Sequence, residues 1–236
     1  CVATLDDSDA VHLVCGAGSR ALLEHGPVSV AVHLHLLEPQ RGLHEDVLHR
    51  RIDGLPKRSL GLTSALLSRA RRRDIEAIRG LSDRARTAIS GNSSYTAARI
   101  GEVYGVEAGV LLPSLVSDEF PAESSSDVSF ESGGMTGPYV VSVGRASWVK
   151  GSWETVSMLS GSGLSLAHVG GGSSEDIARL SQHAESSGVR MWVAPRLSSP
   201  EMAALMRGAP PVVRTAHAGC GPCLLYTSDA AYEGLG

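Results

Sequence analysis

The sequence predicts an α/β protein made of two domains, each with a parallel sheet. Short apolar, β-rich runs alternate with longer segments of helical periodicity in both halves of the chain. Strands that alternate with helices pair in parallel, because each helix carries the chain back to the starting edge of the sheet. A stretch rich in Ser, Glu, Asp and Gly at 117–138 separates the two series and is typical of a linker. The 236 residues, 42% of them hydrophobic, suffice for real cores.

The first domain, residues 1–116, is predicted to alternate strands and helices. The continuous β-branched run at 27–37 fits a buried parallel strand, and Pro39 ends it. Leucine and isoleucine recur near helical spacing over 58–80. The segment 92–105 begins with capping side chains and closes at a glycine, as a helix does. The predicted strands are 11–15, 27–37, 85–90 and 110–113, and the predicted helices are 17–24, 58–80 and 92–105.

The second domain, residues 139–222, restarts the same alternation after the linker. Its predicted strands are 139–143, 164–169, 189–194 and 211–214, and its predicted helices are 151–160, 174–186 and 199–207. Both domains are therefore expected to be Rossmann-like. In such sheets ligands bind in the loops at the carboxyl ends of the strands.

Charge, hydropathy and cysteine content exclude several classes of protein. A net charge of −4 argues against general nucleic-acid affinity. No apolar run approaches the length of about 18 residues that suggests a membrane span. The acidic start at 6–9 carries the wrong charge for an export signal. Four cysteines without such a signal fit a reducing compartment, so we expect a cytoplasmic protein.

Both ends of the chain are predicted to depart from a complete protein. The chain begins with Cys1 rather than methionine, which indicates a truncated start. Residues 223–236 resemble the translation of a sequencing-library adaptor and are treated as a non-native tail, without weight in the fold. The tail takes in the second cysteine of Cys220-Gly-Pro-Cys223, a spacing typical of redox pairs and of half a zinc site. Without a second ligand pair, no redox or metal role is expected for it.

The most informative motif is the loop after the predicted strand 139–143. Gly144 ends the strand, and Arg145 and Lys150 follow where side chains enter the crevice above a parallel sheet. Arginine offers a planar fork to phosphate oxygens, lysine offers a compact charge, and Gly151 lets the next helix start close to a ligand. Lysine is scarce in this arginine-rich chain, which favours a ligand role over a solvent-exposed charge at this position. The residues alone predict an anion site.

The order of elements and several motifs resemble the family 4 glycosyltransferases, which have the two-domain GT-B fold and transfer a sugar from a nucleotide donor with retention of configuration. The likeness covers most of residues 9–222. It implies two Rossmann-like domains with parallel sheets, both incomplete in this chain. The motifs are Ser90-Gly-Asn-Ser-Ser-Tyr-Thr96, Tyr104-Gly105, 110–113 with Asp118-Glu-Phe120, Val143-Gly-Arg145, Lys150-Gly151, 164–172 and 195–202.

The resemblance implies roles for loop residues of the second domain. Arg145 and Lys150 bind the donor diphosphate and neutralise the charge that develops on the departing nucleotide. The loop around Arg196 borders the nucleotide base, and Gly170 and Gly172 form part of the crevice wall. No metal and no cofactor are implied, because GT-B enzymes generally need no metal for their chemistry.

A histidine of the first domain is the candidate for contact with the transferred sugar. The family often carries the pattern Pro-x-x-x-x-x-His after a strand, and Pro27 to His33 has this spacing. His35 lies two residues on and points to the same face of the strand, so either histidine fits the role. An ordinary core role for His33 stays open. A His-x-His pair also binds metals, but the sequence offers no third ligand.

Departures from the family pattern predict that this chain does not turn over. The family holds the donor sugar and ribose with a pair of glutamates, and Ala218 stands where the first is expected. The glycine loop that shapes the acceptor side is also missing from the N-terminal part. We therefore expect a fragment without groups that catalysis needs.

The densest basic run comprises Arg69, Arg71, Arg72 and Arg73 on a predicted helix. As a solvated face it needs no partner. Near anionic lipid it would dock the first domain on the inner face of a membrane that carries a lipid acceptor. Both interpretations stay open.

Three functions remain in competition. The leading hypothesis is a retaining hexosyltransferase that uses a UDP- or GDP-sugar and a carbohydrate, lipid-linked or small-molecule acceptor. The second is a nucleotide-sugar epimerase of the same fold. The third is a nucleotide-binding or interaction module without catalytic activity, which Ala218 suggests because it stands where a glutamate is expected. All three bind a nucleotide diphosphate, and none has nucleic acid as a partner.

Overall fold

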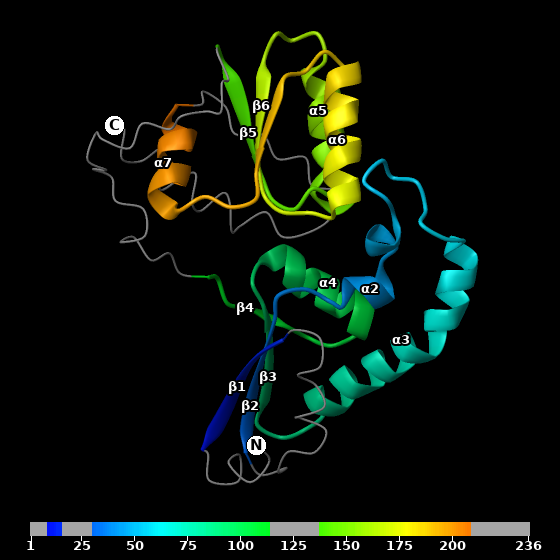
Figure 1. Cartoon of the computed structure of the whole chain (residues 1–236). Helices are drawn as coiled ribbons and strands as arrows, with labels where there is room; N and C mark the ends of the chain where they lie inside the picture. Colours follow the sequence, from blue (N-terminus) through cyan, green and yellow to red (C-terminus); the bar gives the residue numbers. More distant parts are fainter. Residues whose placement is uncertain (1–8, 16–29, 114–136, 209–236) are drawn as a thin grey trace. The chain divides into compact units, whose positions relative to one another are not determined.

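The computed structural model describes residues 9–15, 30–113 and 137–208 (Figure 1). These residues form two compact units, each with its own parallel sheet. Unit 1 holds the described residues up to 46 and from 58 to 113, and unit 2 holds 47–57 and 137–208. The predicted α/β class with parallel sheets is confirmed. The elements predicted at 17–24 and 211–214, most of the linker 117–138, Ala218 and the tail 223–236 lie outside the described residues.

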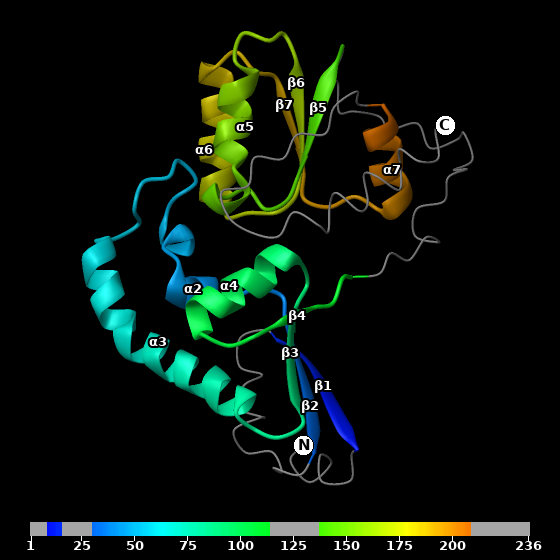
Figure 2. The same ribbon diagram turned by 180° about the vertical axis from the view of Figure 1, so that it is seen from behind.

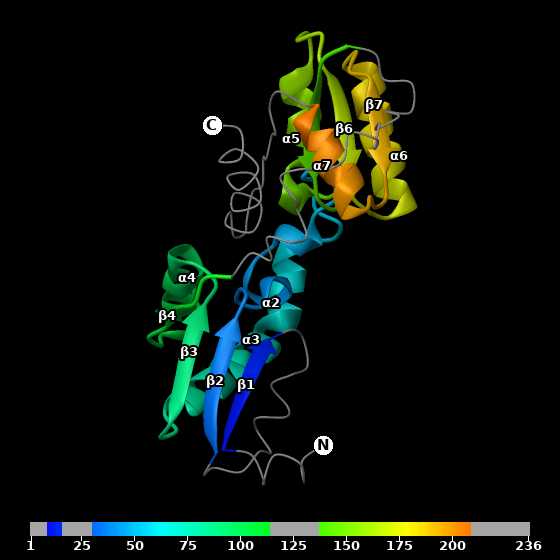
Figure 3. The same cartoon turned by 90° about the vertical axis from the view of Figure 1, so that its left-hand side faces the viewer.

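Unit 1 is built on four parallel strands in the order β1-β2-β3-β4, and Figure 3 shows the first three side by side. The strands are β1 (Ala10–Cys15), β2 (Ala31–Leu36), β3 (Thr87–Gly91) and β4 (Gly109–Val110). β4 has two residues and is shorter than the strand predicted at 110–113. The chain reaches Pro113 there, and proline has no N–H to donate to a ladder.

The helices of unit 1 are α2 (Arg41–His44), α3 (Leu60–Ser82) and α4 (Ser94–Tyr104). α4 starts after Ser93, whose hydroxyl accepts a backbone N–H, and ends at Gly105 in the left-handed region, as predicted. The core contains Leu34, Ile78 and Ile100, all fully buried. These residues join β2 to the last turns of α3, which lie along the sheet in Figure 2, and to α4. The short helix α2 was not among the predicted elements.

Unit 2 has three parallel strands in the order β5-β6-β7. Its elements are β5 (Tyr139–Val143), α5 (Ser152–Leu159), β6 (Ser165–Val169), α6 (Ser174–Ser186), β7 (Met191–Ala194) and α7 (Ser199–Arg207). The bounds of β5, α6 and α7 agree with the prediction. β6 is buried along its whole length, because Leu166 faces the core of α5 and α6 while Ala167 faces α7 on the other side.

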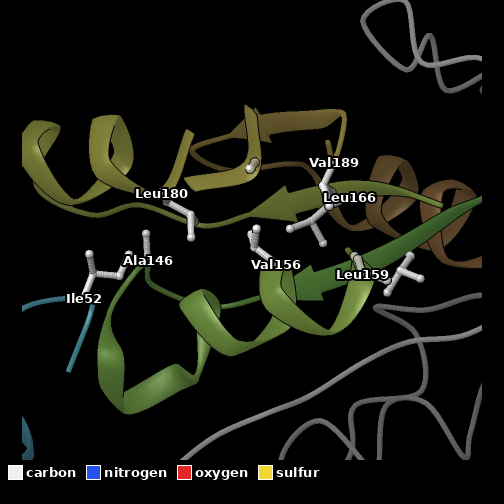
Figure 4. Close-up of a cluster of buried hydrophobic side chains, with 9 residues drawn as sticks. Ile52, Ala146, Val156, Leu159, Leu166, Leu180 and Val189 are labelled. Atoms are coloured by element: carbon white, nitrogen blue, oxygen red, sulfur yellow. The ribbon is translucent and has the colours of Figure 1, made fainter. Parts of the chain in front are cut away.

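Residues 47–57, which we call the strap, belong to unit 2, although the residues on both sides belong to unit 1. A 3₁₀ turn at Val47–His49 opens the strap, and backbone hydrogen bonds between its two arms close it into a tight loop. Ile52 is 1% exposed and joins the core between β6, α5 and α6. Figure 4 shows its side chain beside Ala146 at one end of that core.

Candidate functional site

The loops that follow the strands of unit 2 meet at one edge of its sheet, because all three strands are parallel. The amide of Gly144 donates to the carbonyl of Val169 at 2.9 Å, and the amide of Ala146 donates to the carbonyl of Gly171 at 2.8 Å. A third bond of 2.8 Å joins the amide of Gly170 to the end of β7. These bonds tie together the loops that carry the predicted site residues.

Gly170 and Gly172 allow two of these loops to approach closely. A Cβ at Gly170, where φ is 157°, would overlap the carbonyl oxygen of Gly144. A Cβ at Gly172 would lie 3.1 Å from the Cβ of Ala146. A side chain at Gly170 would push the loops apart, so glycine is required for this contact. The predicted glycine wall therefore lies directly against the loop of Arg145.

Arg145 carries an exposed side chain on a fixed backbone. Its carbonyl oxygen accepts hydrogen bonds from the hydroxyls of Ser147 at 3.2 Å and Ser152 at 3.4 Å. Among the residues that the structure describes, no ion pair involves the Arg145 guanidinium. An exposed guanidinium on a backbone held in this way is available to phosphate oxygens.

Lys150 leaves the same loop from the 3₁₀ turn Trp148–Lys150. The turn is closed by the amide of Gly151, which donates to the carbonyl of Trp148 at 2.9 Å. The stem of Lys150 passes Gly144, since a Cβ built on that glycine would lie 3.5 Å from the lysine Cγ. The stem of the second cationic side chain therefore lies close to the point where β5 ends.

The helix α5 begins directly after this loop. Gly151 has a φ of 64° and turns the chain from the 3₁₀ turn into the helix. The first amides of an α-helix have no partner within the helix, so a helix start attracts anions. Glu154 lies in the same first turn and opposes that attraction. Two cations and one helix start thus gather at one strand end, against one carboxylate.

Arg196 lies at the same edge, exposed in the loop between β7 and α7. A capping box fixes where that loop ends, because the carboxylate of Glu201 accepts from the amide of Ser198 at 2.8 Å. Hydrogen bonds from the hydroxyl and amide of Ser198 lower the pKa of Glu201. The third predicted loop thus also carries a cation at this edge.

Unit 1 holds a separate polar cluster on one face of its sheet. The strand register aligns His12 with His33 and His35 with Ser90. The Nδ1 atoms of His12 and His33 lie 2.9 Å apart. The hydroxyl of Ser90 lies 2.8 Å from His33 Nε2 and 2.9 Å from His35 Nδ1. The two histidines predicted as alternatives therefore share one hydroxyl.

Burial is the main cause that lowers the pKa of His33 and of His35 below 6.5, and the neighbouring imidazoles lower both further. A neutral imidazole offers one donor and one acceptor nitrogen, which suits hydroxyl groups better than anions. Within residues 9–15, 30–113 and 137–208, no group of three or more His, Cys, Asp or Glu side chains can hold a metal ion. His35 and Ser90 are buried, His33 is partly buried and His12 is exposed, so only part of the cluster reaches the surface.

The arginines of the predicted basic run on α3 differ in exposure. Arg69, Arg72 and Arg73 are exposed. Arg71 instead turns inward, and its guanidinium donates to the carbonyl of Leu43 in α2. Arg71 therefore does not belong to the exposed basic face, contrary to the sequence-based expectation, because its Nε donates to α2 and its Nη1 donates to the hydroxyl of Ser64.

Two sets of residues near these sites were not predicted from the sequence. His12 contacts His33, and the parallel pairing of the first two predicted strands was the signal that could have found it. The strap contacts the Arg145 loop through Arg50, whose Cζ lies 5.1 Å from the ring centroid of Trp148. No local sequence pattern predicts that contact, because its two partners are distant in sequence.

The chain matches no protein-family model and no curated protein. No helix in the described part of the chain is both long and apolar enough to cross a membrane.

Proposed function

We propose that this chain binds a nucleotide diphosphate at the loop edge of unit 2 and derives from a retaining hexosyltransferase. The observation that carries the proposal is the pair Arg145 and Lys150, which leave one loop at the end of β5, next to the start of α5. Guanidinium, ammonium and helix amides are the groups that proteins use for diphosphates. Arg196, from the third loop, borders the nucleotide base in this proposal.

The chemistry proposed for this edge is electrostatic. When the sugar–phosphate bond breaks, negative charge grows on the departing diphosphate, and fixed cations stabilise that charge most. His33 or His35 contacts hydroxyls of the transferred sugar, since neutral imidazoles suit that partner. Resemblance to the family 4 glycosyltransferases supports both roles. Ala218 in place of a family glutamate supports binding without turnover.

Titration calorimetry with UDP and GDP tests the binding step. Replacing Arg145 or Lys150 by alanine removes a charge-assisted contact and is expected to weaken binding about tenfold to a hundredfold. Arg207→Ala is the control, because Arg207 is an exposed arginine of the same unit at the end of α7. Lack of binding by the unaltered chain, or equal losses in all three variants, would overturn the proposal.

The competing functions give different products. A transferase moves sugar onto an added acceptor, and an epimerase isomerises the free nucleotide sugar. A chain that binds but does not turn over gives neither, which is the result we expect. Product above that of Lys150→Ala, measured with radiolabelled donor, would contradict the expected inactivity.

We also propose that α3 contacts an anionic lipid surface. Leu62 and Leu66 are 62% and 73% exposed, and Arg69 and Arg73 are exposed on the same side, since helix residues lie about 100° apart. Leucines over hydrocarbon and arginines over anionic headgroups fit a membrane interface. Glu76 lies on this side too and weakens the attraction.

Vesicle sedimentation tests the lipid contact. Arg69→Glu/Arg73→Glu is expected to reduce binding to phosphatidylglycerol vesicles by more than about 25-fold, since loss of each arginine costs about fivefold and each glutamate adds repulsion. The double change Leu62→Ser/Leu66→Ser should also reduce binding. Arg207→Glu and Met158→Ser, exposed positions on other helices, are the controls. Equal binding to uncharged phosphatidylcholine vesicles, or self-association through the leucines without lipid binding, would exclude this contact.

A further inference from the structure

The strap contacts the Arg145–Lys150 loop in two places, at the buried Ala146 and at Trp148. Ile52 is 1% exposed and packs in the same core as Ala146, which directly follows Arg145 and is itself fully buried. Figure 4 shows Ile52 and Ala146 at one end of this core and Leu159 at the other. Ile52 thus fills the end of the core that is next to the loop.

Gly54 and Arg50 both contact Trp148, the first residue of the turn that carries Lys150. A Cβ at Gly54 would lie 2.6 Å from the indole Nε1. The guanidinium of Arg50 lies over the same ring and donates to the carbonyl of Gly54 at 2.9 Å. These contacts fix the indole from the edge and from the face.

The strap is itself well fixed. The amide of Arg51 donates to the carbonyl of Leu55, and the amide of Lys57 donates to the carbonyl of His49, both at 2.8 Å. Asp53 accepts from the amide of Leu55 at 3.1 Å. A loop closed by its own hydrogen bonds can hold a neighbouring loop in place.

We infer that the strap positions Arg145 and Lys150 for diphosphate binding without touching the ligand. This inference rests on the proposed function of the loop. The buried and indole contacts sit at Ala146 and Trp148, which lie between the two cations in the chain. A site held in one geometry by supporting contacts binds more tightly, because less freedom is lost when the ligand arrives.

The main test compares Ile52→Ala with Leu159→Ala. Both residues are buried members of one core, so both variants lose apolar packing and stability. Only Ile52 lies at the end next to the loop. We expect Ile52→Ala to weaken UDP binding about tenfold and Leu159→Ala to change it less than about twofold. Equal losses in the two variants would overturn the inference, since general destabilisation then explains them.

A second pair of variants serves if Ile52→Ala does not fold. Gly54→Ala places a methyl group against Trp148 at a φ of 80°, whereas Gly161→Ala has a similar φ of 74° and meets no atom within 4 Å. The two changes cost similar backbone strain, but only the first displaces the loop. Weaker UDP binding in Gly54→Ala alone supports the inference, and equal binding in the two variants contradicts it.

Hydrogen exchange separates failure of this inference from failure of the proposed function. Without ligand, Ile52→Ala should speed exchange of the amides of Ala146 and Gly151, whose bonds hold the loop, and Leu159→Ala should not. If the unaltered chain binds no nucleotide but this difference appears, the strap still positions the loop and only the ligand assignment fails. Unchanged exchange in Ile52→Ala overturns the positioning role.

Discussion

The two units differ in how a buried polar side chain is hydrogen-bonded. In unit 1 the buried Asp74 bonds to His44 at 2.7 Å and to the hydroxyl of Tyr104 at 2.9 Å. In unit 2 the buried His168 has no hydrogen-bond partner among the described residues. Buried polar groups that bond to each other stabilise a fold, whereas a buried polar group without a partner destabilises it.

The largest effect should come from breaking the buried network of unit 1. Asp74→Ala leaves His44 and Tyr104 without their shared carboxylate, and should lower the free energy of unfolding by about 3 kcal/mol or more. Denaturant unfolding measures this loss. Arg72→Ala, an exposed neighbour on α3, should change stability by less than about 0.5 kcal/mol. A small loss in Asp74→Ala would mean that the buried network contributes little to unit 1.

The next effect should have the opposite sign and lies in unit 2. His168 is 1% exposed and both its ring nitrogens lack partners in the described structure. His168→Leu removes that unfavourable burial and should raise the free energy of unfolding by about 1–2 kcal/mol. His183, bonded to Ser157 at 2.9 Å on the surface, gives the control change His183→Leu, which should bring no gain. Destabilisation by His168→Leu would show that the imidazole has a favourable role.

The smallest effect should be a loss of stability of unit 1 in acid. The folded-state pKa values of His33 and His35 lie below 6.5 because of burial and the neighbouring imidazoles. As pH falls from 6.5 towards those values, the unfolded chain takes up protons that the folded chain does not, so stability decreases. Hydrogen exchange of the β2 amides at pH 7.5 and pH 5 measures it for unit 1 alone.

His12→Gln sharpens this pH comparison. Removing one imidazole removes one cause of the lowered pKa of His33 and His35, so the acid effect should shrink. An unchanged acid effect would mean that His12 contributes little to either lowered pKa.

The sequence predicts elements well where the signal is local. α6 and α7 have the expected bounds, because serine caps start both helices and apolar residues recur at helical spacing. The sheet edge with Arg145 and Lys150 was also placed correctly at the end of β5, since a glycine ends that strand. The strap and the inward turn of Arg71 were not predicted. Each depends on a partner distant in sequence, Ala146 for Ile52 and Leu43 for Arg71.

The strap also makes the core of unit 2 depend on two distant parts of the chain. Every other buried member of the core that contains Ile52 lies beyond residue 137, so Ile52 is synthesised long before its partners. Contacts between distant parts of a chain form slowly. A fragment cut at residue 137 therefore has a gap in this core beside Ala146. A peptide of residues 47–57, added to that fragment, should fill the gap.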